Sequence, residues 1–257
     1  MNTYLSAAID AAHAAGSLIR ENFMRPLEVN VAEAHDLKLE LDVRTQALIT
    51  ESLLSDFSNT SVLGEEGSVE TANADGDWIV DPIDGTVNYF YGIPHFCVSI
   101  AFRRAEQIEL GVIYDPIKDE LWRAARGEPA YLNDEAIHVS ERASLSESVV
   151  SVGFSKTPAA IDLGLKNLSV MVTKARKCRM MGSAALDLAY VACGRFDAYI
   201  EKSVNLWDVA AGWLLVECAG GRVIVQPSPL DEKKIAIVAW NGKIGLSDLD
   251  GTTPNKA

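Results

Sequence analysis

Apolar side chains recur at spacings of three and four over residues 5–23, which is the period of a helix with one buried face. Asn2 and Thr3 are residue types that cap a helix start, and Pro26 ends helical hydrogen bonding. The pattern therefore predicts an amphipathic helix that ends before Pro26. The polar segment 28–40 has no clear period and predicts no regular element, whereas residues 42–57 predict a second helix.

After residue 57 the apolar runs become short, as is typical of β-strands. In the first half we expect strands at residues 61–64, 78–80, 96–103, 108–114 and 120–125, the last three as an antiparallel meander. In the second half we expect strands at residues 149–154, 196–201, 222–225 and 235–240, and helices at residues 183–193 and 208–219. Ser183 is placed to cap the first of these helices.

A polar stretch at residues 140–148 separates two halves that differ in their predicted order of helices and strands. Residues 1–142 read as a helix pair followed by an antiparallel sheet, and residues 143–257 as alternating helices and strands. A chain of 257 residues can form one large domain or two packed halves. We therefore expect an α/β protein, one compact unit of two subdomains, whose end frays from Asp248 onward.

Composition and charge narrow the class of protein. Hydrophobic residues are 48%, charged residues 23% and the net charge is −13, as in an ordinary globular protein. Non-specific nucleic-acid binding needs a basic surface, so we expect no nucleic-acid partner. The chain shows neither a signal-peptide pattern nor the roughly 20 apolar residues of a membrane span, so we expect a cytoplasmic protein without membrane contact. The four cysteines form no Cys-x-x-Cys pair and are expected to be buried, reduced thiols.

The segment from Trp78 to Thr86 carries the clearest chemical signal. An apolar strand runs into Asp81, Pro82 is expected to end the strand pairing, and Asp84 follows before a glycine. Two carboxylates this close raise each other's pKa or require a cation, and Mg²⁺ prefers oxygen ligands. The alternative is an ordinary Asp-Gly turn between two strands.

Two other elements also meet acidic residues at their ends. Glu65 and Glu66 follow an apolar strand, and Asp208 begins an apolar helix. A solvated loop would explain the two glutamates, and the helix dipole alone favours an aspartate in a first helical turn. Spacing by itself therefore leaves a metal site and a coincidence of three element ends equally open.

Taken together, these blocks resemble the inositol monophosphatase family of Mg²⁺-dependent, lithium-sensitive phosphatases. The resemblance covers nearly the whole chain and is in detail that of bacterial members. The matching blocks are Gly64–Glu66, Trp78–Thr86 with Asn88, Ile93–Ile100, Gly182–Tyr190 and Trp207–Gly212. The resemblance implies a layered αβαβα sandwich, with an antiparallel N-terminal sheet, a mixed C-terminal sheet and the active site between the halves.

The resemblance also implies two to three Mg²⁺ ions beside the substrate phosphate. Glu65, Asp81 and the backbone carbonyl of Ile83 would hold the first ion. Asp81 would bridge to a second ion, which Asp84 and Asp208 also hold, and Glu65 would reach a third, largely hydrated ion. Such an arrangement suits phosphoryl transfer, because paired metals clamp the attacking and leaving oxygens and activate water.

Further roles carry over to side chains and backbone groups around the phosphate. Glu65, Thr86 and Asp42 are the implied catalytic residues, with Thr86 orienting the attacking water in a pair with Asp42. Thr86 can serve in this way because a hydroxyl both donates and accepts, although it could also be a helix cap. The implied substrate contacts are Asp84, Gly85, Thr86, Gly182, Ser183, Ala184, Glu201 and Asp208.

One block departs from the family pattern. Many members have a threonine two residues before the aspartate that matches Asp42, and residues 39–42 here read Leu-Glu-Leu-Asp. The loop just upstream helps to hold the third ion in the family, so the departure bears on residues 28–42 and on that ion. The four histidines share no ligand spacing and are expected to be structural or surface residues.

The implied activity is hydrolysis of a small phosphorylated polyol or sugar, such as myo-inositol 1-phosphate, by a homodimer without a covalent phosphoenzyme. Fructose 1,6-bisphosphate, 3′-phosphoadenosine 5′-phosphate and histidinol phosphate stay open as substrates, because relatives act on them through the same metal core. Val87-Asn88-Tyr89 is closer to the inositol phosphatases than to the nucleotidase branch. A non-catalytic, partner-binding member is a further alternative, since some bacterial relatives associate with transcription machinery, but the complete set of acids argues against it.

Overall fold

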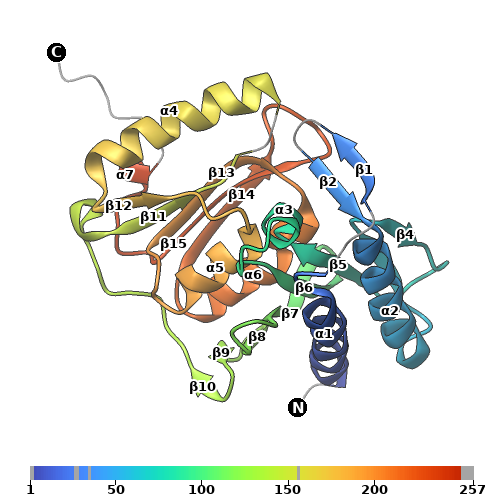
Figure 1. Ribbon diagram of the computed structural model, residues 1–257. Coiled ribbons are helices and arrows are strands. Elements are labelled where there is room, and N and C mark those ends of the chain that lie inside the picture. Colours follow the sequence, from blue (N-terminus) through green and yellow to red (C-terminus); the bar gives the residue numbers. More distant parts are fainter. Residues whose placement is uncertain (1–2, 26–28, 34–35, 155–156, 250–257) are drawn as a thin grey trace.

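The computed structural model describes residues 3–25, 29–33, 36–154 and 157–249, with the backbone alone for residues 29–33 and 36–38. Figure 1 shows the elements stacked in layers: α1 with α2, a first sheet, α5 with α6, a second sheet, and α4 with α7. This is the expected αβαβα sandwich. Within the described residues, no helix is long and apolar enough to cross a membrane.

The first layer is the predicted helix pair. Helix α1 spans Thr3–Asn22 and α2 spans Glu40–Asp56, and the small and aliphatic residues of their shared face pack on the first sheet. The expectation that the intervening polar segment is irregular was wrong. Strands β1 (Val29–Glu33) and β2 (Asp36–Leu39) pair antiparallel there, because cross-strand hydrogen bonds satisfy the backbone without needing an apolar period.

The first sheet has the strand order β10-β9-β8-β7-β6-β5-β3-β4. Its strands are β3 (Ser61–Gly64), β4 (Gly67–Val69), β5 (Asp77–Asp84), β6 (Cys97–Arg104), β7 (Gln107–Asp115), β8 (Glu120–Ala125), β9 (Tyr131–Leu132) and β10 (Glu135–Ala136). The expected meander is β6-β7-β8. The sheet is not wholly antiparallel, however. The chain reverses twice between β3 and β5, at either end of β4, so β5 returns parallel to β3.

The prediction that strand pairing ends at Pro82 was wrong, because β5 continues through Pro82 to Asp84. Its pairing with β6 is interrupted between Asp81 and Asp84 and resumes at Asp84 opposite Cys97. Proline cannot donate to the ladder, and the local irregularity accommodates it without ending the strand. This irregularity places the two aspartates at one end of the strand.

The second sheet is mixed, as expected, with the order β12-β11-β13-β15-β14. Its strands are β11 (Val149–Val152), β12 (Lys177–Arg179), β13 (Ala198–Val204), β14 (Arg222–Pro227) and β15 (Ile235–Trp240). Helix α4 (Pro158–Lys174) and strand β12 were not predicted. The missed signal is Thr157 followed by Pro158: the threonine side chain accepts from Ala160 N–H, and proline is well suited to the first helical position.

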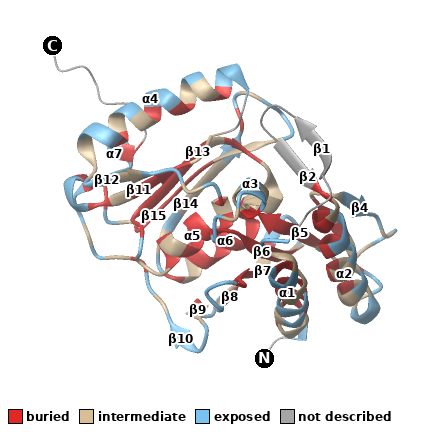
Figure 2. Ribbon diagram, viewed as in Figure 1, coloured by how far each residue is buried: buried red, intermediate tan, exposed pale blue. Residues whose placement is uncertain are grey.

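Helices α5 (Ala184–Ala192) and α6 (Leu206–Cys218) lie between the two sheets and are buried on most sides. Figure 2 shows buried residues concentrated along α5, β5 and β13. Small residues permit the close packing: a Cβ on Gly111 of β7 would lie 2.7 Å from the Ala211 carbonyl oxygen of α6. The core therefore continues through the middle layer.

Two smaller expectations also meet the structure. All four cysteines are free, as expected, but only Cys97 is buried, while Cys178, Cys193 and Cys218 are partly exposed. The short helix α7 (Leu246–Leu249) includes Asp248, where the end was expected to fray, and its last residue is buried. Residues 250–257 lie outside the described part of the chain.

Candidate active site

The end of β5 and the short helix α3 (Thr86–Phe90) form the centre of the candidate site. Asp81 is buried, and one of its carboxylate oxygens accepts a hydrogen bond of 3.0 Å from the Ile83 N–H. The backbone then turns at Gly85 into α3. The local turn thus holds one oxygen of Asp81 through the Ile83 N–H.

Asp84 is held from the other half of the chain. Its carboxylate accepts from Ser183 Oγ at 2.5 Å, from Ala185 N at 2.7 Å and from Ala184 N at 3.3 Å. These groups form the start of α5, which Ser183 caps through Leu186 N–H, as predicted. A carboxylate is favoured there, because the first N–H groups of a helix lack intrahelical partners.

Asp42 approaches from α2. It lies in the first turn of that helix, where its carboxylate accepts from Leu39 N at 2.9 Å. Its other oxygen lies 3.3 Å from Thr86 Oγ1, which is also 2.9 Å from the Ile83 carbonyl. Asp42 and Thr86 are therefore neighbours in space although 44 residues separate them.

Asp208 and Glu201 come from the second half of the chain. Helix α6 begins at Leu206, and Asp208 accepts from Asn205 N at 2.9 Å and from Asn205 Nδ2 at 3.2 Å in a capping arrangement. Glu201 is buried on β13 and accepts from the Tyr199 hydroxyl. We had not predicted Asn205, although an asparagine three residues before an aspartate at a helix start is a capping signal.

Electrostatics show that these acids share one environment. Burial, followed by the charges of Asp208 and Asp42, raises the pKa of Glu65 to about 8. Burial and Asp84 raise the pKa of Asp208 to about 8. Burial, with Glu65 and then Asp84, raises the pKa of Asp81 well above its ordinary value. The acidic residues after β3, at the end of β5 and at the start of α6 therefore lie together.

The remaining acids show the same direction. Burial raises the pKa of Asp42 to about 7, and the charge of Glu66 adds to it. Burial raises the pKa of Glu201 to about 7 and that of Asp84 to about 6, although the hydrogen bonds from Ser183 and the α5 backbone oppose the shift for Asp84. Several carboxyls thus resist ionisation together, which a bound cation would relieve.

The turn into α3 and the turn into α5 are tied together. Asn88 donates to the backbone carbonyls of His95 and Met181, each at 2.8 Å. Gly85 has φ +96° and Gly182 has φ +82°, in the left-handed region that favours glycine. The start of α5, whose N–H groups hold Asp84, is thereby fixed against the turn at Gly85.

Gly85→Ala is expected to lower the free energy of unfolding by about 2–5 kcal/mol. The left-handed conformation costs a side chain about 1–2 kcal/mol, and overpacking adds about 1–3 kcal/mol. The new Cβ would lie 3.0 Å from the His95 carbonyl oxygen and 3.3 Å from that of Gly182. Gly127→Ala is the matched control, because Gly127 has φ +84° and a Cβ added there would meet no described atom within 4 Å. Equal losses for both variants in urea unfolding would contradict the role of the close contact.

The donor set fits hard divalent cations, which prefer oxygen ligands. Glu65, Asp81, Asp84 and Asp208 would supply carboxylates, and Ile83 would supply a carbonyl. Over the ranges that the structure describes, no three acidic, histidine or cysteine side chains already stand at the spacing of a finished metal site. The fit is therefore one of chemistry and shared electrostatics, with Asp84 and Asp208 each also bound to helix-start N–H groups.

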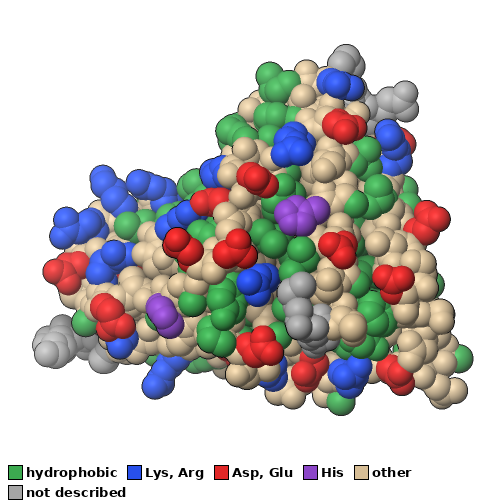
Figure 3. Space-filling view, turned by 90° about the horizontal axis from the view of Figure 1, so that it is seen from below, with side chains coloured by type: hydrophobic (Ala, Val, Ile, Leu, Met, Phe, Trp, Pro, Cys, Tyr) green, Lys and Arg blue, Asp and Glu red, His purple; other side chains and the backbone are tan. Residues whose placement is uncertain are grey.

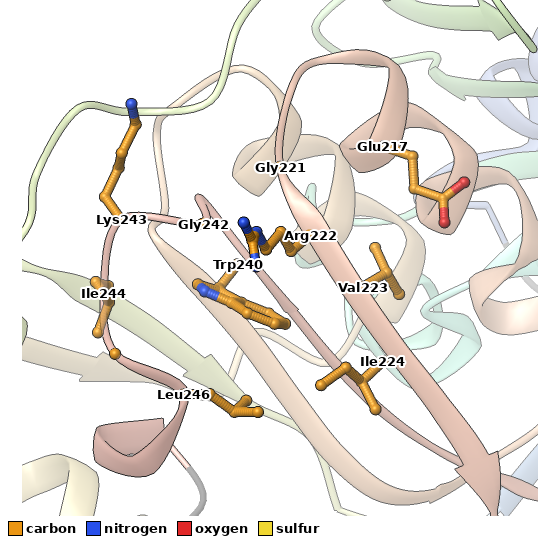
Figure 4. A pocket seen from close by; sticks show the side chains of 11 residues that line it. Glu217, Gly221, Arg222, Val223, Ile224, Trp240, Gly242, Lys243, Ile244 and Leu246 are labelled. Carbon is orange, nitrogen blue, oxygen red and sulfur yellow. The ribbon is translucent and has the colours of Figure 1, made fainter.

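A hollow of about 700 Å³ lies away from these acids, beside β14, β15 and the segment that leads into α7. Figure 4 shows Trp240 and Ile224 along it, with Arg222 and Lys243 nearby. Glu217 is its one acidic lining residue, and that side chain already binds Arg126 and Trp213. The hollow therefore lacks the donors of a metal-dependent centre.

Fold and site together define a class: a layered α/β protein with a multi-carboxylate centre at the meeting point of two helix starts and a strand end. Comparison with known proteins gives the family. A model described as "Inositol monophosphatase family" matches residues 1–246. The chain belongs to the inositol monophosphatase family, as its sequence blocks indicated.

Individual relatives carry two kinds of name. Nus factor SuhB of Pasteurella multocida is 39% identical over 227 residues, covering 87% of this chain and 85% of that protein. Inositol-1-monophosphatase of Rhizobium meliloti is 39% identical over 228 residues, covering 84% and 83%. Among solved structures, the extragenic suppressor protein suhB of Bartonella henselae superposes with a TM-score of 0.89 at 34% identity, over 97% of this chain and 98% of that one.

Proposed function

We propose that this chain is a Mg²⁺-dependent phosphatase that hydrolyses a small polyol phosphate, with myo-inositol 1-phosphate as its best substrate. The observation that carries the proposal is the meeting of Glu65, Asp81, Asp84 and Asp208 in one environment that raises the pKa of all four. Family membership supports a phosphatase. Lithium inhibition and a homodimeric assembly are further parts of the proposal that rest on the family resemblance.

We assign Glu65, Asp81 and the Ile83 carbonyl to one Mg²⁺ site, Asp81, Asp84 and Asp208 to a second, and Glu65 alone to a third, more hydrated one. Bound Mg²⁺ neutralises phosphoryl charge and lowers the pKa of water. The backbone N–H groups of Gly85 and Thr86 can donate to the phosphate oxygens.

Thr86 and Asp42 are proposed to prepare the attacking water. Thr86 Oγ1 can donate its single proton to Asp42 or to the Ile83 carbonyl, which leaves its lone pairs free to accept from water. Burial of Asp42 raises its pKa to about 7, so this carboxyl can take up a proton near neutral pH. The pair thus orients the water and provides a place for its proton.

Thr86→Val is expected to lower kcat roughly 100-fold, the lower end of what a positioned proton-transfer group contributes. Valine keeps the shape and removes the hydroxyl that contacts Asp42. Thr45→Val is the matched control: its buried hydroxyl has no hydrogen-bond partner among the described residues, so its removal is expected to leave turnover unchanged. A similar kcat in both variants would remove Thr86 from the mechanism.

The substrate's polyol hydroxyls are assigned to Glu201 and to the α5 start at Gly182, Ser183 and Ala184. Glu201 is buried, and its charge contributes to the raised pKa of Asp208, so it lies close to the metal-ligand group. A carboxylate accepts from hydroxyl groups and repels a second phosphate. This favours a monophosphate of a polyol over fructose 1,6-bisphosphate.

The test is phosphate release from inositol 1-phosphate, fructose 1,6-bisphosphate, 3′-phosphoadenosine 5′-phosphate and histidinol phosphate, with Mg²⁺ and with EDTA. Turnover that requires Mg²⁺ and is fastest with inositol 1-phosphate supports the proposal. Faster turnover of another ester would keep the phosphatase and change its substrate. No release from the folded protein at saturating Mg²⁺ would refute the phosphatase on these substrates.

A second candidate is a role in which the chain binds a partner protein, and two observations favour it. Several relatives are named Nus factor SuhB. Residues 143–257 carry 13 basic and 11 acidic side chains, against 10 and 25 in residues 1–142. Figure 3 shows Lys and Arg gathering toward the side where α4, α7 and β12 lie in Figure 1. Asp84→Asn separates the candidates, because it should abolish turnover and leave partner binding intact.

A further inference from the structure

His95 and Asp187 are buried side chains that each hold one polar atom without a hydrogen-bond partner among the described residues. His95 precedes β6 and is 6% exposed, and Asp187 lies in the first turn of α5 and is 2% exposed. The His95 Nε2 atom and the Asp187 Oδ1 atom are 3.9 Å apart, and within the part of the chain that the structure describes neither atom makes a hydrogen bond. Leaving two such groups unpaired is costly in a protein interior, so their mutual approach calls for an explanation.

The other contacts of these two side chains, among the described residues, involve different atoms. The second oxygen of Asp187 accepts from Ser151 Oγ of β11 at 2.5 Å. The His95 ring lies edge-on to Tyr190, with 5.9 Å between the ring centroids. The charged groups that act on His95 are Lys118 and Asp115, which pair with each other. Asp187 in turn feels the charges of Asp84 and Glu201. The free oxygen of Asp187 and the free nitrogen of His95 thus face each other.

The backbone around this pair bears directly on the candidate site. The carbonyl oxygen of His95 accepts from Asn88 and would lie 3.0 Å from a Cβ on Gly85. One turn before Asp187, the N–H groups at the start of α5 hold Asp84. Any shift of α5 relative to residues 93–97 would therefore move the N–H groups that hold Asp84 relative to the turn at Gly85.

We propose that His95 and Asp187 are a positioning pair that sets the start of α5 against the phosphate-binding turn, and so sets Asp84 for Mg²⁺ binding. This inference rests on the proposed function of the site. Closing the gap by about 0.7 Å would make an ordinary N–H···O hydrogen bond. Neither residue belongs to the proposed metal or substrate contacts, so both would act through Asp84 and the α5 backbone, as outer-shell partners of metal ligands do.

The directions of the two pKa shifts agree with a hydrogen bond in which His95 is neutral and Asp187 resists ionisation. Burial lowers the pKa of His95 to about 4, and the Lys118 charge adds to this effect. Burial also raises the pKa of Asp187 well above its ordinary value. The two groups therefore need share only one proton between them near neutral pH.

Two variants of His95 separate positioning from packing. His95→Phe keeps a ring against Tyr190 and removes the polar nitrogen. His95→Gln loses the ring and keeps a polar group that can reach Asp187. We expect His95→Phe to raise the half-saturating Mg²⁺ concentration about tenfold, a typical outer-shell effect, and His95→Gln to stay close to the wild type. His138→Phe, on an exposed histidine, is the matched control.

Binding of Mg²⁺ is measured by calorimetry, and turnover is measured separately, with circular dichroism as a check that each variant is folded. If His95→Phe turns over at the wild-type rate and binds Mg²⁺ as tightly as the wild type, the inference is overturned and the proposed function stays intact. A wild type that binds Mg²⁺ without releasing phosphate would refute the proposed function alone. The change in Mg²⁺ affinity between the wild type and His95→Phe would still decide whether His95 and Asp187 position the site. A variant order with His95→Gln weakest, or a wild type that binds no Mg²⁺, would overturn the positioning role.

Discussion

Asp81→Asn is expected to lower kcat at least about a thousandfold, the upper end of what one charge-stabilising group contributes. The same substitution is expected to raise the melting temperature of the metal-free protein. Asp81 is buried, and its pKa is raised by burial and by the charges of Glu65 and Asp84. An asparagine keeps the oxygen that accepts from Ile83 N–H and removes a carboxyl whose ionisation burial and the neighbouring acids oppose.

Opposite effects on activity and stability are the mark of a site whose charges serve catalysis rather than folding. Asp197→Asn is the matched control, because Asp197 is buried, pairs with Arg142 and accepts from Val149 N–H. That variant should lose about 1.5–3 kcal/mol of stability, the value of a hydrogen bond to a charged group, and keep its turnover. Thermal unfolding in EDTA and initial rates in Mg²⁺ decide the matter. A destabilised Asp81→Asn protein with normal turnover would contradict the whole assignment of the site.

The metal-free protein is expected to become less stable as the pH rises from about 5 to about 8.5. A carboxyl whose pKa is higher in the folded than in the unfolded state binds its proton more tightly when folded. Its stabilisation is complete below the unfolded value, 3.8 for Asp or 4.5 for Glu, and is lost as the pH rises through the folded value. The folded values are about 6 for Asp84, about 7 for Asp42 and about 8 for Glu65 and Asp208.

Saturating Mg²⁺ should remove most of this loss, because the ion requires deprotonated ligands and replaces the bound protons. In EDTA we expect the melting temperature to fall by at least about 5 °C over this range, at roughly 2–4 °C per kcal/mol for a chain of this size. Glu65→Gln should flatten the profile, and Glu232→Gln, on an exposed loop, should leave it unchanged. A profile that rises with pH in EDTA would show that the acids are ionised and paired in the folded protein.

The acidic residues of the site show how much of it can be predicted from local sequence. Asp81 and Asp84 stand three positions apart after an apolar strand, so their proximity follows from chain geometry alone. Glu65 and Asp208 also follow recognisable element boundaries. Spacing did not show, however, that these ends meet, and only the resemblance to a family did so before the structure. No local feature indicated the approach of His95 to Asp187.

Hydrophobic periodicity in the sequence by itself determined α1, most of α2 and the meander β6-β7-β8, because a helix or strand with one buried face repeats at a fixed interval. Only the tertiary structure decided the pairing of β1 with β2, the parallel partnership of β3 and β5, and the continuation of β5 through Pro82. It also brought Thr86 to Asp42 and the start of α5 to Asp84. These contacts join residues far apart in the chain, and their free energy comes from hydrogen bonds and burial that exist only once the layers have packed.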